Sequence, residues 1–180
     1  MSLYTRTGDN GETSLANGDR VSKNSSLIRF VGLLDELNAH LGLCVSQLKN
    51  ISEINFESEI KSLEKIQNNL FVIGSISVLA NLEFEVTKEV QKLENLIDEY
   101  EKTLPKLTNF ILPGGHLISA QIHLLRSCSR RVEILAHSLE DKEIKLITRY
   151  LNRLSDYFFV LARFINFKFE ISEPIWKIER

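Results

Sequence analysis

Four residues with charged or titratable side chains recur along one predicted helix at intervals of four, three and four: Arg126, Arg130, Glu133 and His137. These intervals place side chains on one face of a helix. Arg131 lies about a hundred degrees round the same helix. The guanidinium fork of arginine matches phosphate and carboxylate oxygens with paired hydrogen bonds. The row therefore suggests a binding surface for a polyanion such as ATP, although a solvated face with Arg–Glu pairs within the helix explains the spacing at least as well.

A second polar row follows on the next predicted helix, where Arg149, Asn152, Asp156 and Arg163 fall near one side. The turn over 139–142 is short, so the two helices are expected to be antiparallel neighbours. Their polar rows can then face a common cleft. Asn152 can hold a sugar hydroxyl or a base, or it is simply a polar residue at the edge of a packed face.

The N-terminal segment is rich in hydroxyl groups and glycine, with Lys23 shortly after it. Successive backbone N–H groups in such a loop can wrap phosphates, and the lysine would add a cation. The segment lacks the GxxxxGK[ST] spacing of a Walker loop, so a simple turn is the alternative. The residues that this hypothesis involves are Thr5, Arg6, Thr7, Gly8, Thr13 and Ser14.

Histidines and cysteines do not form a recognisable catalytic or metal-binding motif along the chain. The pairs Glu36/His40 and Glu133/His137 have ExxxH spacing, whereas di-iron bundles use ExxH. Cys44 and Cys128 lie on apolar helical stripes and lack metal-site spacing, so we expect two buried free thiols.

The composition is that of an ordinary globular protein. The chain has 180 residues, 43% of them hydrophobic and 26% charged, with only 8 Gly and 3 Pro, which favours long helices. A net charge of -2 gives no reason to expect nucleic acid or an anionic membrane as a partner. Since neither a presequence nor an apolar stretch of membrane-spanning length is found, we expect a soluble, cytoplasmic protein.

Apolar residues at intervals of three and four predict five helices, at about 26–48, 57–81, 87–104, 117–139 and 141–169. Short connections between them predict an all-α fold, an antiparallel five-helix bundle with an irregular N-terminal arm. The arm spans residues 1–24, as an irregular segment or a short hairpin, and the bundle spans 25–180. Asp35 lies off the apolar stripe of the first helix, either as an exposed acid or as a partner for an arginine of the fourth.

Three further segments carry expectations about packing. Residues 70–80 are apolar nearly all round, which predicts burial on several sides. Three large apolar residues precede the Pro113-Gly114-Gly115 turn, so this loop is expected to press against another part of the protein. The tail with Pro174 and Trp176 is expected to dock on the bundle.

Taken together, these segments resemble the PduO-type ATP:cob(I)alamin adenosyltransferases over nearly the whole chain. Five motifs occur in the order of that family. They are Tyr4-Thr5-Arg6-Thr7-Gly8-Asp9-Asn10-Gly11-Glu12-Thr13-Ser14-Leu15, Val31-Gly32-Leu33-Leu34-Asp35-Glu36-Leu37-Asn38, Phe110-Ile111-Leu112-Pro113-Gly114-Gly115, Arg126-Ser127-Cys128-Ser129-Arg130-Arg131-Val132-Glu133 and Tyr150-Leu151-Asn152-Arg153-Leu154-Ser155-Asp156-Tyr157-Phe158.

The resemblance implies a homotrimer that binds ATP between adjacent subunits, with the arm folded over the triphosphate and Mg²⁺ accompanying the phosphates. Asp35 would pair with Arg126 across the subunit boundary, and Phe110 would enter the corrinoid site and exclude the lower axial base. The implied ATP contacts are Thr5, Arg6, Thr7, Gly8, Thr13, Ser14 and Lys23 from the arm, and Arg130, Arg131, Glu133 and Asn152 from the last two helices.

The implied reaction is transfer of the 5′-deoxyadenosyl group of ATP to cob(I)alamin, with release of triphosphate and formation of adenosylcobalamin. A corrinoid reductase and a B12-dependent mutase are possible partners. The alternative is an ATP- or corrinoid-binding carrier or sensor without turnover. The chain departs from the family at Ile134, where many members have arginine, and at Asn10, where lysine is common. These departures concern individual ATP contacts.

Overall fold

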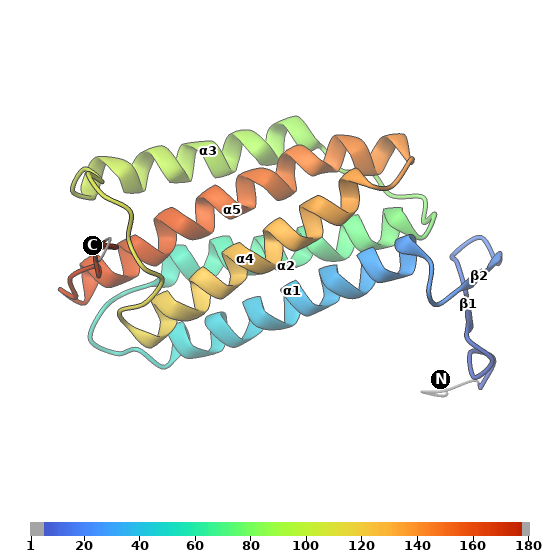
Figure 1. The fold of residues 1–180 in the computed structure, drawn as a ribbon, viewed down its shortest axis with the longest axis horizontal. Helices are drawn as coiled ribbons and strands as arrows, with labels where there is room; N and C mark the ends of the chain where they lie inside the picture. Colours follow the sequence, from blue (N-terminus) through green and yellow to red (C-terminus); the bar gives the residue numbers. More distant parts are fainter. Residues whose placement is uncertain (1–5, 178–180) are drawn as a thin grey trace.

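The computed structural model describes residues 6–177, so Thr5 lies outside the described residues. Within this range the chain forms a bundle of long helices (Figure 1), which agrees with the predicted all-α class. The helices are α1 (Ser26–Lys49), α2 (Glu57–Ser77), α3 (Val86–Thr103), α4 (Leu117–His137) and α5 (Lys142–Lys168). None of them is long and apolar enough to cross a membrane.

Side-chain caps explain where several helices begin. The Ser25 hydroxyl accepts a hydrogen bond from the Ile28 amide at the start of α1, and the Asp141 carboxylate accepts from two backbone amides at the start of α5. The His116 ring nitrogen accepts from the Ile118 amide ahead of α4. Each cap satisfies an amide that has no partner within its own helix.

Helix α5 supplies much of the core, packing against both α3 and α4, while α1 packs against α2 and α4. The predicted stripe of α5 is buried: Ile144, Ile147, Leu151, Leu154, Phe158, Leu161 and Ile165. Arg163 shares the side of α5 that carries Asp156, as the spacing predicts, but it does not line the cleft described below. Its side chain is buried nearer the C-terminal end of the helix, where the guanidinium Nε donates to Glu173 at 2.9 Å and Nη2 donates to the Pro105 carbonyl.

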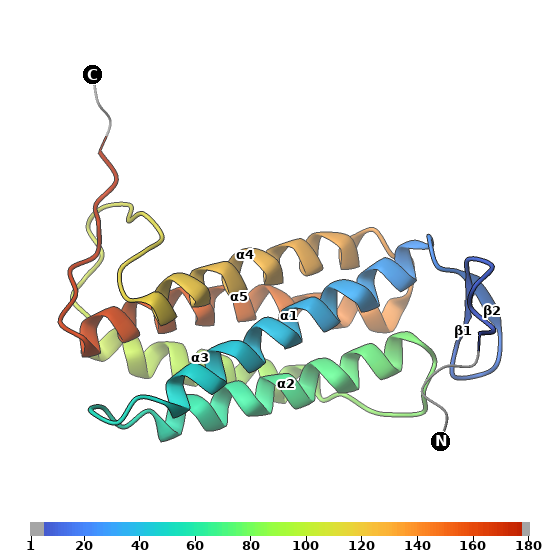
Figure 2. The same ribbon diagram turned by 90° about the horizontal axis from the view of Figure 1, so that it is seen from below.

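The described part of the arm is a hairpin at one end of the bundle (Figures 1 and 2). Strand β1 (Glu12–Ser14) pairs antiparallel with β2 (Arg20–Ser22), with Thr13 opposite Val21. The Leu15 side chain is buried, and the Ala16 amide donates to the Val78 carbonyl at 2.9 Å. These contacts fix the hairpin beside the C-terminal end of α2.

The expected burial of residues 70–80 on several sides is wrong. The Phe71 side chain is 67% exposed and that of Leu79 is 51% exposed. Phe71 lines a groove of about 450 Å³ between α1 and α2, together with Val31 and Gly74. An apolar helix face indicates that this face is buried by packing. Its periodicity does not show whether the same chain or another chain packs against it.

The apolar loop before α4 is held by the C-terminal tail. Trp176 donates its backbone N–H to the Phe110 carbonyl at 2.8 Å, and Leu112 donates to the Pro174 carbonyl at 2.8 Å. Ile111 and Ile175 form an antiparallel bridge between these bonds. The loop is therefore pressed against another segment, as predicted, and the tail docks on this loop.

Candidate functional site

Part of each polar row, namely Arg126, Arg130 and Asp156, lines a cleft of about 360 Å³ between α3 and α4, with α5 at its floor. Arg126 and Arg130 of α4 line it, and Arg153 and Asp156 of α5 lie opposite and form an ion pair with each other. Glu101 of α3 also lines the cleft. The predicted common cleft between the last two helices is thus present, and its cationic side belongs to α4.

Arg126 is incompletely paired within this cleft. Its Nε atom is buried and has no hydrogen-bond acceptor among the described residues. Both ring nitrogens of the neighbouring His123 are likewise buried without a partner in residues 6–177. Burial and the charge of Arg126 lower the pKa of His123 to about 4, so this imidazole is neutral at physiological pH.

Further along α4, two of the predicted nucleotide contacts are joined directly. The Asn152 side-chain amide donates to Glu133 Oε1 at 2.9 Å, which links α5 to α4. His137 Nε2 lies 3.8 Å from the same carboxylate oxygen. Arg131 faces a different neighbour, since its Nη2 lies 2.6 Å from Glu36 Oε2 on α1. Arg130 and Glu133 therefore share one side of α4, while Arg131 points towards α1.

The arm places a cation against a tight turn. Gly11 adopts a φ of 82° and accepts a hydrogen bond from the Lys23 amide at 2.8 Å. The Lys23 ammonium lies 3.0 Å from the point where a Cβ on Gly8 would be. Arg6 also has a positive φ, of 59°. Gly8 thus lets the lysine approach the backbone of a turn whose N–H groups are suited to phosphate oxygens.

Arg20 is a structural residue of this arm that the sequence analysis missed. Its Nη2 donates to the Thr7 carbonyl at 2.8 Å and its Nη1 donates to the Ser14 hydroxyl at 3.2 Å. The hairpin register sets Arg20 directly opposite Ser14. A prediction of this register from the sequence would have indicated the contact. Arg20 therefore ties the predicted phosphate-binding turn to β1.

Asp35 and Arg126 do not meet within one chain. Asp35 is exposed and lines the groove between α1 and α2, beside Phe71. Arg126 lines the separate cleft between α3, α4 and α5. A direct pair between these two side chains therefore requires two copies of the chain.

The arm and Phe110 also lie far apart in one chain. The arm adjoins the start of α1, whereas Phe110 precedes the start of α4, at the opposite end of the bundle (Figure 1). The 21 residues of α4 give a separation of about 30 Å from the helical rise alone. The Phe110 side chain is 77% exposed, an unusual position for a large apolar residue.

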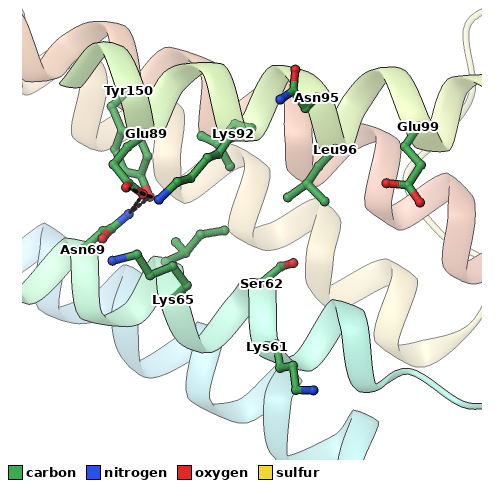
Figure 3. Close-up of a pocket in the computed structure, with 12 residues that line it drawn as sticks. Lys61, Ser62, Lys65, Asn69, Glu89, Lys92, Asn95, Leu96, Glu99 and Tyr150 are labelled. Atoms are coloured by element: carbon green, nitrogen blue, oxygen red, sulfur yellow. Dashed lines mark hydrogen bonds and ion pairs between the residues drawn. The ribbon is translucent and has the colours of Figure 1, made fainter. Parts of the chain in front are cut away.

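A groove of about 380 Å³ between α2 and α3, which the sequence analysis also missed, contains none of the predicted site residues (Figure 3). Asn69 donates to Glu89 at 2.8 Å and to the Tyr150 hydroxyl at 3.0 Å, and Lys92 lies 2.6 Å from Glu89. Burial acts to raise the pKa of Glu89, but the hydrogen bonds from Lys92 and Asn69 outweigh it and lower that pKa. These polar groups satisfy one another and stabilise the bundle.

Comparison with known proteins identifies the same family over most of the chain. Residues 3–165 match the family model described as cobalamin adenosyltransferase. The corrinoid adenosyltransferase of Bacillus subtilis is 39% identical over 171 residues, covering 92% of this chain and 87% of the relative. The cobalamin adenosyltransferase of Cupriavidus metallidurans is 38% identical over 181 residues, covering 99% of this chain and 95% of the relative.

Solved structures agree with this assignment. A phenylalanine-to-alanine variant of the PduO-type ATP:corrinoid adenosyltransferase from Lactobacillus reuteri, complexed with cobalamin and ATP, superposes with a TM-score of 0.89 at 29% identity, covering 98% of this chain and all of that one. An arginine-to-lysine variant of the same enzyme, complexed with ATP, gives a TM-score of 0.85 at 30% identity, covering 97% of this chain. The chain therefore belongs to the cobalamin adenosyltransferase family.

Proposed function

We propose that this chain, a corrinoid adenosyltransferase by its family, transfers the 5′-deoxyadenosyl group of ATP to cob(I)alamin at sites formed between adjacent subunits of a homotrimer. One observation carries the proposal of a shared site. The arm with Lys23 and the exposed Phe110 lie at opposite ends of one chain, about 30 Å apart by helical rise. A nucleotide held by the arm reaches a corrinoid beside Phe110 only if a neighbouring chain supplies one of them.

The state of Arg126 supports the same arrangement. Its Nε is buried without an acceptor in residues 6–177, while Asp35 is exposed beside the apolar side chain of Phe71. In a cyclic assembly the α1–α2 groove of one chain can pack on the α4 face of the next. Asp35 would then supply the missing acceptor, and Phe71 would be covered.

The reaction suits a site made of cations and backbone amides. Cobalt(I) attacks the ribose 5′ carbon and the bond to the triphosphate breaks, so the corrinoid itself is the nucleophile. The protein has to orient the 5′ carbon and stabilise the negative charge of the departing triphosphate. Lys23 and the arm amides would do this from one chain, with Arg130 from the next. Glu133 and Asn152, already hydrogen-bonded, would orient the nucleoside.

Phe110 is suited to act on the corrinoid. A phenyl ring that projects from an apolar loop offers no ligand atom, so its approach to the lower face of the corrinoid would displace the axial base without replacing it. Loss of that ligand makes the cobalt easier to reduce. The ring is accessible for this role because it is 77% exposed.

Mg²⁺ would be carried by the triphosphate. Within residues 6–177, one group of three or more nearby metal-ligating side chains is found, formed by Glu36, His40 and Cys128. That set contains a thiol and an imidazole, whereas Mg²⁺ prefers oxygen ligands and commonly binds through substrate phosphates. The described residues therefore fit a magnesium ion that arrives with ATP.

Co-expression of two inactive variants tests the shared site. Asp35→Ala and Arg126→Ala should each abolish most adenosylcobalamin formation when assembled alone. In a mixed trimer, an Asp35 from the second variant can meet an Arg126 from the first at one interface, so roughly a quarter of all interfaces in a randomly assembled population should be intact. Mixed assemblies should recover activity in that proportion. If they stay as inactive as their parents, the two residues do not cooperate between chains.

The wider setting follows from the reaction class. A reductase must supply cobalt(I), and a B12-dependent mutase is a natural recipient of the product. We expect both encounters to take place in the cytoplasm, without nucleic acid or a membrane as a partner.

A further inference from the structure

Helices α1 and α4 bring together three side chains that differ in kind and share the ability to bind a metal. Glu36 and His40 lie one turn apart on α1, and Cys128 projects from α4, which packs beside it. One ligand atom from each, a carboxylate oxygen, an imidazole nitrogen and the thiol sulfur, lies within 4.8 Å of the other two. We propose that Glu36, His40 and Cys128 form a binding site for Zn²⁺, separate from the magnesium that accompanies ATP.

The donor set favours zinc. Zinc binds thiolate, imidazole and carboxylate ligands in tetrahedral geometry, and sites with three protein ligands keep water in the fourth position. Ligand atoms around a tetrahedral zinc ion lie about 3.5 Å apart. Closing the site therefore needs side-chain shifts of about 1 Å, which the exposed Glu36 carboxylate can make. Mg²⁺ and Ca²⁺ would gain little from the thiol and imidazole.

Two of the three ligands are otherwise unoccupied. Neither the His40 imidazole nor the Cys128 thiol makes a hydrogen bond or ion pair with a residue that the structure describes. Cys128 is a buried free cysteine, and zinc binds cysteine as the thiolate, so the metal takes the place of the thiol proton. Metal binding should consequently release a proton, which a calorimetric titration in buffers of different ionisation enthalpy measures.

Arg131 competes for the third ligand. Its guanidinium lies 2.6 Å from Glu36 Oε2, so this oxygen binds zinc only in exchange for the ion pair, and the positive charge opposes zinc at the other oxygen. The pair is half exposed, which makes its exchange for a metal bond inexpensive. Arg131→Gln should therefore tighten zinc binding. Weaker zinc binding in Arg131→Gln would contradict the assignment of Glu36 as a ligand.

The chain contains its own comparison. Glu133 and His137 repeat the same spacing on α4, with His137 Nε2 3.8 Å from Glu133 Oε1, but no cysteine joins them in the described part of the chain. If spacing on one helix were sufficient, both pairs would bind. If the Cys128 thiol is required as a ligand, zinc binds at the α1 pair alone.

The experiment uses the full chain freed of metal by a chelator, without ATP or corrinoid. Zn²⁺ is titrated by calorimetry, and Co²⁺ serves as a spectroscopic substitute whose thiolate charge-transfer absorption reports the cysteine bond. We expect one metal per chain. Cys128→Ser and His40→Ala should each weaken binding on the order of 100-fold, and Cys128→Ser should abolish the charge-transfer band. His137→Ala and Cys44→Ala serve as matched controls and should leave both signals unchanged.

Circular dichroism and thermal melting establish that each variant is folded before its titration is interpreted. The proposal is overturned if the folded wild-type chain shows no thiolate charge transfer, if the band survives in Cys128→Ser, or if His137→Ala weakens binding as much as His40→Ala. None of these readouts depends on turnover, so they separate the zinc site from the adenosyltransfer reaction.

Discussion

The phenyl ring of Phe110 meets the indole ring of Trp176 edge-on, with ring centroids 6.2 Å apart and planes at 81°. The backbones of the two residues are joined as well, through the hydrogen bond from Trp176 to the Phe110 carbonyl. An exposed aromatic ring on a loop would ordinarily sample several rotamers. The tail therefore restricts the ring that is proposed to enter the corrinoid site.

Trp176→Ala should lower the rate of adenosyl transfer about 10- to 100-fold and leave ATP affinity unchanged, because a poorly positioned Phe110 affects the reacting centre and not nucleotide binding. Trp176→Phe retains an aromatic edge and should recover most of the rate. Steady-state kinetics with separate determination of kcat and KM provides the measurement. Equal loss in the alanine and phenylalanine variants would mean that Trp176 acts through something other than this ring contact.

Gly115→Ala should displace the loop that carries Phe110. Gly115 has a φ of 98°, and a Cβ there would clash with Asn166, whose side chain accepts from the His116 amide at 2.9 Å and donates to the Gly114 carbonyl at 3.0 Å. We expect a loss of at least about 2 kcal/mol in the free energy of unfolding.

Gly18 is the matched control for that substitution, since its φ is 91° but nothing lies within 4 Å of its Cβ position. Gly18→Ala should cost only the backbone strain, about 1 kcal/mol. Denaturant unfolding of both variants measures the difference. Equal losses would show that the contact with Asn166 is unimportant.

Lys23→Met should weaken Mg-ATP binding about 10- to 100-fold, because it would remove the proposed charge-assisted hydrogen bond to the phosphates. Lys61→Met is a suitable control, since Lys61 lines the groove between α2 and α3 and pairs with Glu57. Calorimetric titration with Mg-ATP should show a loss for Lys23 alone. Unchanged affinity for Mg-ATP in Lys23→Met would mean that this lysine does not contact the nucleotide.

His123 should make the bundle sensitive to acid. Its pKa is about 4 when folded and near 6.5 when unfolded, so the unfolded chain binds more protons between these values. The stabilising contribution is complete above about pH 6.5 and is lost as the pH falls towards 4, to a total on the order of 3 kcal/mol. Unfolding free energies measured from pH 7 to pH 4 should show this slope, and His123→Leu should flatten it. An unchanged slope in that variant would mean that a group other than His123 causes the acid sensitivity.

Much of the fold could be predicted because apolar residues recur at helical intervals along each helix, as Leu151 and Phe158 do along α5. The cleft could be predicted because a short turn makes α4 and α5 neighbours. The burial of Arg163 could not be predicted, because its position on the helix does not reveal that Glu173 and the Pro105 carbonyl are near it. Contacts between distant segments, such as Phe110 with Trp176, leave no periodic pattern.

Other parts of the site lay beyond a single chain's sequence pattern. Phe71 was expected to be buried because it is apolar, yet its cover is not provided by residues 6–177. The same limit applies to Asp35 and Arg126, whose residue types indicate a charge pair but whose positions in one chain keep them in separate cavities. Their proposed pairing therefore requires a second copy of the chain.

The most direct measurement is an anaerobic assay that combines the chain, Mg-ATP and chemically reduced cobalamin and follows adenosylcobalamin by its absorption and triphosphate by chromatography. The account predicts equimolar formation of both products by the wild-type chain, and a Phe110→Ala variant that binds Mg-ATP normally but has lost most of its rate. A folded wild-type chain that binds both substrates and forms neither product under strict anaerobic reduction would contradict it.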